Sequence, residues 1–152
     1  MQYEIIELNE KTAAGFCART SNLSPDMGQT IGGLWQKLYA PDGCWQLTNR
    51  TNEKALGIYT DYAADERGEY TVMAGCEVNS EAVPAGFTVC RIPAGRYARF
   101  IVRGHMVRAV HEFWQKLWQM ELDRSFVCDF EEYQNADTEN AEIHIYIGLK
   151  SS

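Results

Sequence analysis

The chain of 152 residues carries a hidden internal duplication, and this feature constrains its fold more than any other. The tetrapeptide WQKL occurs at residues 35–38 and again at 114–117. Three weaker matches keep the same order in both halves: AGxxAR at 14–19 and 94–99, TDY and EEY at 60–62 and 131–133, and VMAG and IYIG at 72–75 and 145–148. Four matches in one order predict two structural repeats, over about residues 1–80 and 81–152.

Each repeat carries the same order of elements: a strand region, one helix and two more strands. Ser24, Pro25 and Asp26 predict a helix start, because a capping hydroxyl, a proline and an acid favour the first turn. The predicted elements are extended segments at 3–21 (broken near Gly15) and 87–103 (broken at 93–95), helices at 24–39 and 107–118, strand pairs at 55–62 with 70–78 and 125–134 with 141–149, and connecting loops at 64–68 and 135–140.

Two β-α-β-β units predict an α+β fold in which antiparallel sheets carry two main helices on one face. The units should be related by a pseudo-twofold axis, with a ligand cleft between them. Because the length suits one domain, residues 1–152 are predicted to form a single domain.

Composition narrows the classes of function. A net charge of -7 repels phosphate backbones and argues against a nucleic-acid partner. The chain has no long apolar run that could cross a membrane, and its first residues do not form a secretory signal, so we expect a cytoplasmic protein with no membrane partner. Five scattered cysteines without a CxxC motif predict reduced thiols, and the three histidines lack metal-ligand spacing. We therefore predict neither a metal nor another cofactor.

Strand alternation sorts the side chains of the last strand pair. Ile143, Ile145 and Ile147 share one face, which we assign to the core. The preceding strand has an apolar side with Phe126, Cys128 and Phe130, and another side with Val127, Asp129, Glu131 and Tyr133. On this assignment Glu131 and Tyr146 point away from the core together and could present a carboxylate and a phenol to a ligand. A simply solvated sheet face is the plainer interpretation.

Three segments resemble the GyrI-like small-molecule-binding domain, the effector-binding module of AraC-type and multidrug-sensing MerR-type transcription regulators. They are GIYTDY at 57–62, YTVMAGCEV at 70–78 and DFEEY at 129–133. The resemblance spans nearly the whole chain and implies a duplicated β-α-β-β fold. Such regulators join the module to a DNA-binding helix-turn-helix. Because the resemblance begins at residue 3, we expect a stand-alone, bacterial-type member.

The resemblance also implies that the ligand-binding acid is the first Glu of the Phe-Glu-x-Tyr motif, here Glu131, and that a last-strand tyrosine lines the same pocket, here Tyr146. Many members end that strand in a Pro-Ile sequence, whereas this chain has IGL at 147–149, so its pocket rim should differ. Further candidate walls are Trp35 and Trp114 at equivalent repeat positions, Tyr59, Tyr62, Tyr97 and Tyr133, and Met73, the repeat equivalent of Tyr146. Core packing is the plainer interpretation of these residues, and Glu77 is interpreted as a surface acid.

A carboxylate in an aromatic pocket is costly, because burial disfavours its charged form, and a lipophilic cation would relieve that cost. The main hypothesis is therefore a binding protein for hydrophobic, cationic or amphiphilic compounds. The chain lacks HExxH, GxSxG, P-loop and GxGxxG motifs, which favours binding over catalysis. Two alternatives stay open. The resemblance includes hydrolases of cyclopropane-bearing compounds, for which Glu131 and Tyr146 would be the catalytic pair, and a gyrase inhibitor, which would make the chain a protein-interaction module.

Overall fold

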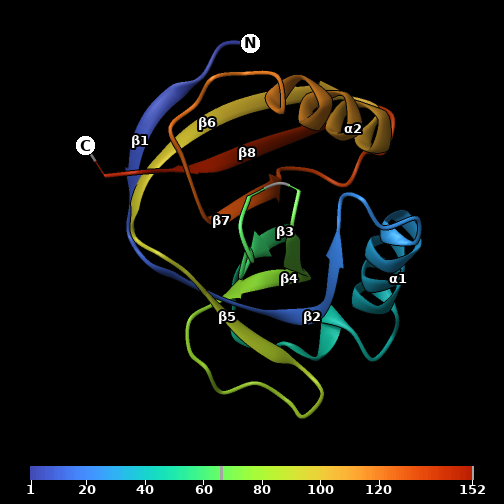
Figure 1. Ribbon diagram of the computed structural model, residues 1–152. Coiled ribbons are helices and arrows are strands. Elements are labelled where there is room, and N and C mark those ends of the chain that lie inside the picture. Colours follow the sequence, from blue (N-terminus) through green and yellow to red (C-terminus); the bar gives the residue numbers. More distant parts are fainter. Residues whose placement is uncertain (66, 152) are drawn as a thin grey trace.

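The structure, a computed structural model, describes residues 1–65 and 67–151 as one curled antiparallel sheet with helices on one face (Figure 1). Residue 66 of the predicted turn at 64–68 lies outside the described residues. Within the described part the elements are β1 (Glu4–Leu8), β2 (Lys11–Ser21), α1 (Met27–Tyr39), the 3-10 helix η1 (Cys44–Gln46), β3 (Arg50–Thr60), β4 (Glu69–Val78), β5 (Thr88–Ile92), β6 (Gly95–Gly104), α2 (Met106–Leu117), β7 (Arg124–Tyr133) and β8 (Ala141–Leu149). The predicted α+β class is confirmed.

The strands follow the order β1-β6-β8-β7-β3-β4-β2-β5, which reads the same from both ends when the two repeats are exchanged. The approximate twofold axis therefore lies between the central strands β3 and β7. Each repeat gives its first strand to the other, because β1 pairs with β6 and β5 pairs with β2. The two repeats are interlocked by this exchange.

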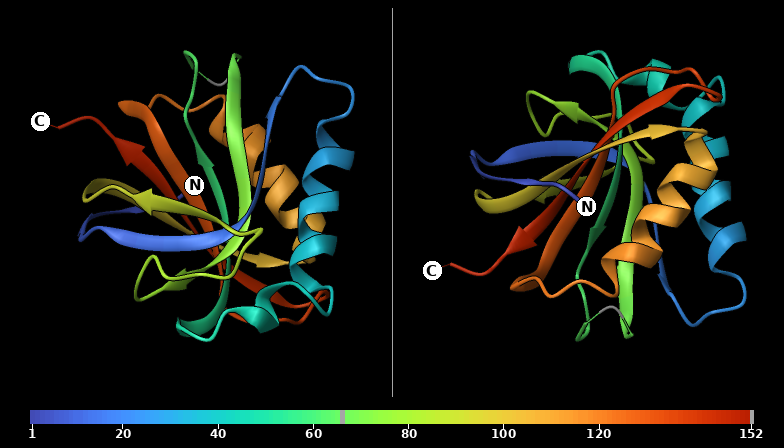
Figure 2. Two further views of the ribbon diagram at one scale, coloured as in Figure 1. Left: turned by 90° about the horizontal axis from the view of Figure 1, so that it is seen from below. Right: turned by 90° about the horizontal axis from the view of Figure 1, so that it is seen from above.

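Both helices lie on the same side of the sheet (Figure 2). Leu34 and Leu38 of α1 pack in a core cluster with side chains of β2 and β4, while Phe113 and Leu117 of α2 pack in a second cluster with β6 and β8. A third cluster, around Phe130, buries the opposite face. Apolar side chains are thus needed on both faces of the central strands. Among the described residues, neither helix is long and apolar enough to cross a membrane.

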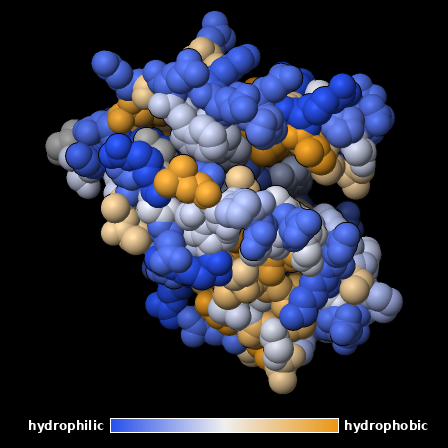
Figure 3. Space-filling view, turned by 45° about the vertical axis from the view of Figure 1, so that its right-hand side comes forward, coloured by the Kyte–Doolittle hydropathy of each residue, from blue (hydrophilic) through white to orange (hydrophobic). Residues whose placement is uncertain are grey.

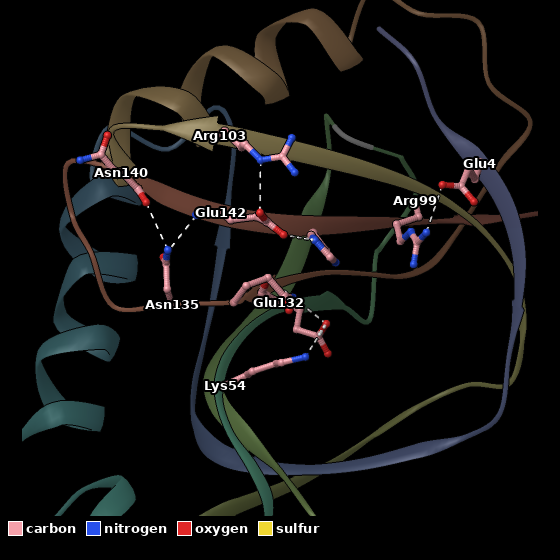
Figure 4. Close-up of polar contacts among 10 residues, drawn as sticks. Glu4, Lys54, Arg99, Arg103, Glu132, Asn135, Asn140 and Glu142 are labelled. Atoms are coloured by element: carbon pink, nitrogen blue, oxygen red, sulfur yellow. Dashed lines mark hydrogen bonds and ion pairs between the residues drawn. The ribbon is translucent and has the colours of Figure 1, made fainter.

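Ion pairs join the strands on the face opposite the helices (Figure 4). The carboxylate of Glu142 accepts a hydrogen bond from Arg103 Nε at 3.2 Å and lies 2.8 Å from His144 Nε2. Glu132 lies 3.9 Å from Lys54 Nζ. Partly exposed pairs of this kind each contribute little stability, so we assign them to the surface of the fold.

The structure corrects several predicted boundaries. The strand break lies at residues 9–10, whereas Gly15 sits inside β2, where a Cβ would collide with the carbonyl of Ala74 on β4. Glycine there permits two strands to approach closely and does not interrupt the strand. α1 begins three residues after Ser24, with Asp26 at its N-cap, and β3 begins at Arg50, before the predicted start. The predicted break at 93–95 is confirmed between β5 and β6.

Candidate ligand-binding site

A cavity of about 1290 Å³ opens between the two helices and the central strands. Ile31 and Trp35 of α1 form one wall, Val110 and Trp114 of α2 form the other, and β7 contributes Glu131 to the floor. Figure 3 turns the side that carries the helices toward the viewer and shows apolar residues exposed between polar ones on this face. A space of this size with apolar and aromatic walls suits a drug-sized molecule.

Glu131 is almost fully buried, with 2% of its surface exposed. Its Oε2 accepts hydrogen bonds from Trp114 Nε1 at 2.8 Å and Tyr59 Oη at 3.0 Å, and its Oε1 accepts one from Tyr133 Oη at 2.8 Å. All three donors are neutral groups. They fix the position of the carboxylate without supplying a counter-charge.

The environment of Glu131 opposes its charge. Burial is the largest influence and raises the pKa of the carboxyl, while the hydrogen bonds from Trp114, Tyr133 and Tyr59 act in the other direction. Burial, followed by the negative charge of Glu131, also raises the pKa of Tyr59 and Tyr133, so both phenols stay protonated and can donate. Within the described part of the chain, the ion pairs involve other carboxylates and leave Glu131 without a cationic partner.

The aromatic residues flank this carboxylate in two related pairs. The rings of Tyr59 and Trp114 lie 5.3 Å apart at 67°, and those of Tyr133 and Trp35 lie 5.2 Å apart at 77°. One pair is converted into the other by exchanging the repeats. The approximate twofold axis therefore passes beside Glu131, and both halves of the chain contribute to the same binding space.

Gly57 of β3 provides the room that the Glu131 side chain occupies. The two residues are register partners across β3 and β7. A Cβ at residue 57 would lie 2.8 Å from Glu131 Oε1 and 3.2 Å from Trp35 Cζ2. The carboxylate and the indole therefore depend on the missing side chain at this position.

We expect Gly57→Ala to cost about 1–3 kcal/mol of unfolding free energy, because the added methyl must push Glu131 or Trp35 aside. Urea denaturation followed by tryptophan fluorescence measures this. Gly33→Ala is the control, since a Cβ there would meet no atom within 4 Å. Equal stability of Gly57→Ala and wild type would contradict this account.

A second buried acid, Asp129, lies behind the cavity wall. Asp129 accepts hydrogen bonds from Tyr62 Oη at 2.6 Å, Arg124 Nη2 at 2.8 Å and the backbone N–H of Gly148 at 2.8 Å. Tyr62 and Arg124 line the cavity. Unlike Glu131, this acid has a cationic partner, so the Asp129 group has a structural role and offers no free charge to a ligand.

The structure separates the predicted ligand-binding residues into two groups. Those that line the cavity are Glu131, Trp35, Trp114, Tyr133, Tyr59 and Tyr62. Those that lie on the opposite face of the sheet, in the cluster around Phe130, are Tyr146, Tyr97 and Met73. Met73 and Tyr146, which the sequence analysis treats as repeat equivalents, both lie on the face of the sheet opposite the cavity.

The face assigned to Tyr146 is wrong because cross-strand partners share a face. Glu131 pairs with Ile145, whereas Tyr146 pairs with Phe130 and stacks on its ring at 4.5 Å. Alternation within each strand could not show which face of β7 adjoins which face of β8, because that depends on the register of the pair. The predicted catalytic pair of Glu131 and Tyr146 is therefore divided by the sheet.

Some cavity residues were missed by the sequence analysis. Val110 and His111 precede Trp114 by four and three positions, so the helical period could have placed them beside it. Glu77 lies away from the cavity and pairs with Lys11 at 3.5 Å, as expected of a surface acid. Among residues 1–65 and 67–151, no group of three or more His, Cys, Asp or Glu residues could hold a metal ion.

Comparison with protein families gives one match that spans most of the chain. The family model Cass2, described as integron-associated effector binding protein, matches residues 4–149. Integron cassette protein VCH_CASS2, from the mobile metagenome of Vibrio cholerae, has 28% sequence identity and a TM-score of 0.79, over 97% of this chain and 95% of that chain. Among proteins with curated descriptions, none matches significantly.

Two further solved structures share the fold at lower identity. SAV2435, solved with bound tetraphenylphosphonium, has 21% identity and a TM-score of 0.80, over 99% of this chain and 95% of that chain. A Staphylococcus aureus MU50 protein described as a transcription regulation protein has 21% identity and a TM-score of 0.77, over 99% of both chains. The GyrI-like fold implied by the sequence is confirmed.

Proposed function

This chain belongs to the Cass2 family of integron-associated effector binding proteins, and we propose that it binds hydrophobic compounds that carry a positive charge. The observation that carries the proposal is the buried carboxylate of Glu131, which faces an apolar cavity and has only neutral hydrogen-bond donors. The related SAV2435 binds tetraphenylphosphonium, a compound of this class.

A bound cation would supply a counter-charge to Glu131, whose hydrogen-bond donors are all neutral. At about 4 Å and an effective dielectric constant near 20, the attraction is about 4 kcal/mol before desolvation of the ligand is subtracted. Burial, which raises the pKa of Glu131, strengthens the preference for such a partner, because the ligand stabilises the ionised form.

The aromatic walls add affinity without demanding one ligand shape. Trp35, Trp114, Tyr59 and Tyr133 border the space above the carboxylate. A cation over one of these rings gains about 0.5–2 kcal/mol. Neither coulombic attraction nor ring contact requires a particular arrangement of hydrogen bonds, so we expect the protein to accept a range of compounds.

The hydrogen bonds of Glu131 favour binding over hydrolysis. A general base needs a lone pair that can reach a water molecule, but Glu131 already accepts three hydrogen bonds. Tyr146, its predicted catalytic partner, lies across the sheet. These contacts favour a carboxylate that is held in place and attracts a cation over one that removes a proton from water.

A pair of ions with matched shape tests the proposal. Tetraphenylphosphonium and tetraphenylborate have nearly the same size but opposite charge. Titration calorimetry at neutral pH should show at least about tenfold tighter binding of the phosphonium. Equal affinity for the two ions, or no binding of the phosphonium, would rule out a cation receptor.

A further inference from the structure

The two helices that wall the cavity differ at the positions that face it. α1 has glycine at residues 28 and 32, and both line the cavity. The spacing of the WQKL repeat places Val107 and His111 of α2 at the equivalent positions, and these also line the cavity. At these two positions α1 therefore has no side chain facing the cavity, whereas α2 has a valine and a histidine.

Neither packing nor backbone conformation requires glycine at these two positions. A Cβ added to Gly28 or Gly32 would meet no atom within 4 Å. Both residues lie within the α-helical range Met27–Tyr39, a conformation that any side chain except proline adopts readily. The absence of side chains at Gly28 and Gly32 enlarges the cavity.

Keeping glycine there weakens the helix. Glycine is a poor helix former because it loses more conformational freedom on folding than other residues. α1 has little to compensate for this, since the side chain of its N-cap residue Asp26 makes no capping hydrogen bond and its first turn has no acid. Its place on the sheet depends on buried contacts such as those of Leu34 and Leu38.

We propose that Gly28 and Gly32 are the specificity-determining positions of the cavity, where they make it wide enough for ligands that are bulky in three dimensions. This inference deepens the proposed ligand-binding function and rests on it. A planar cation can lie against Trp35 or Trp114 without using the space beside the bare face of α1. A cation whose rings lie in several planes needs that space.

Leucine substitutions at two adjacent glycines provide a matched test. Gly32 lines the cavity, whereas its neighbour Gly33 does not, and a Cβ at either position meets open space. Each variant should raise Tm by about 2–4 °C, because leucine favours the helix. Gly32→Leu should weaken tetraphenylphosphonium at least about tenfold and planar proflavine less than about threefold, while Gly33→Leu leaves both affinities unchanged.

The outcomes separate this inference from the proposed function. If wild type binds the two cations but Gly32→Leu weakens both equally, or neither, the width argument is overturned. If wild type binds neither cation, the proposed function fails, and the neutral dye N-phenyl-1-naphthylamine still tests the cavity. Its fluorescence should fall in Gly32→Leu and stay at the wild-type level in Gly33→Leu. The same fluorescence in all three proteins would overturn the inference.

Discussion

Replacing Asp129 by alanine is expected to cost about 3–5 kcal/mol of unfolding free energy. Asp129 is 0% exposed and accepts hydrogen bonds from Arg124, Tyr62 and the backbone of Gly148. Alanine would leave the buried guanidinium of Arg124 without its counter-charge, and the other two donors without an acceptor. Urea denaturation followed by tryptophan fluorescence measures the loss.

A surface acid and a double variant serve as controls for this prediction. Asp123 is 76% exposed and lies 3.8 Å from Lys150, so Asp123→Ala should change stability by less than about 0.5 kcal/mol. Arg124→Met combined with Asp129→Leu should recover most of the loss, because it removes both buried charges. If Asp129→Ala is as stable as wild type, the buried pair of Asp129 and Arg124 does not stabilise the fold.

The helices and their two tryptophans were predictable because the strongest repeat lies on them. The match of residues 35–38 with 114–117 correctly equates Trp35 with Trp114, and both line the cavity. The weaker match of TDY with EEY is displaced. In the structure the counterpart of Tyr133 is Tyr59, as their contacts with the two tryptophans show, whereas the match had equated Tyr62 with Tyr133.

The partner of each strand and the faces that adjoining strands share could not be predicted from the sequence pattern. Nothing in residues 4–8 reveals that β1 pairs with β6 of the other repeat, because pairing depends on tertiary contacts more than on local preference. The prediction of the face on which Tyr146 lies was wrong for a related reason. Alternation separates the two faces of β8, but only the register of β7 and β8 shows that Ile145, and not Tyr146, shares a face with Glu131.

The position of Glu131 explains why the other repeat has no carboxylate equivalent to it. A group on the axis has no room for a symmetric copy. Gly57, the register partner of Glu131, would place a side chain against Oε1, and a second carboxylate there would also repel the first. The aromatic surroundings can therefore be nearly symmetric while the carboxylate beside the axis has no symmetric copy.

Replacing Glu131 by glutamine should weaken tetraphenylphosphonium binding about 100-fold, because the charge facing the ligand is lost. Glutamine has nearly the same shape. Its amide oxygen can still accept from Trp114 and Tyr59, and its nitrogen can donate to Tyr133, so the variant should fold. Glu132→Gln is the matched control, since Glu132 lies on the opposite face and pairs with Lys54. Similar affinities of the two variants would contradict the role of Glu131.

The pH dependence of binding follows from the raised pKa of Glu131. The ligand has a permanent charge, so only the protein titrates. As pH falls through the raised pKa, the carboxyl becomes neutral and affinity should fall, while Glu131→Gln should stay weak throughout. A pH dependence that persists unchanged in Glu131→Gln would contradict this account. Stability should change in the opposite sense. The folded state holds this proton more tightly than the unfolded chain, so unliganded wild type should lose stability relative to Glu131→Gln as pH rises from the ordinary carboxyl pKa through the raised one.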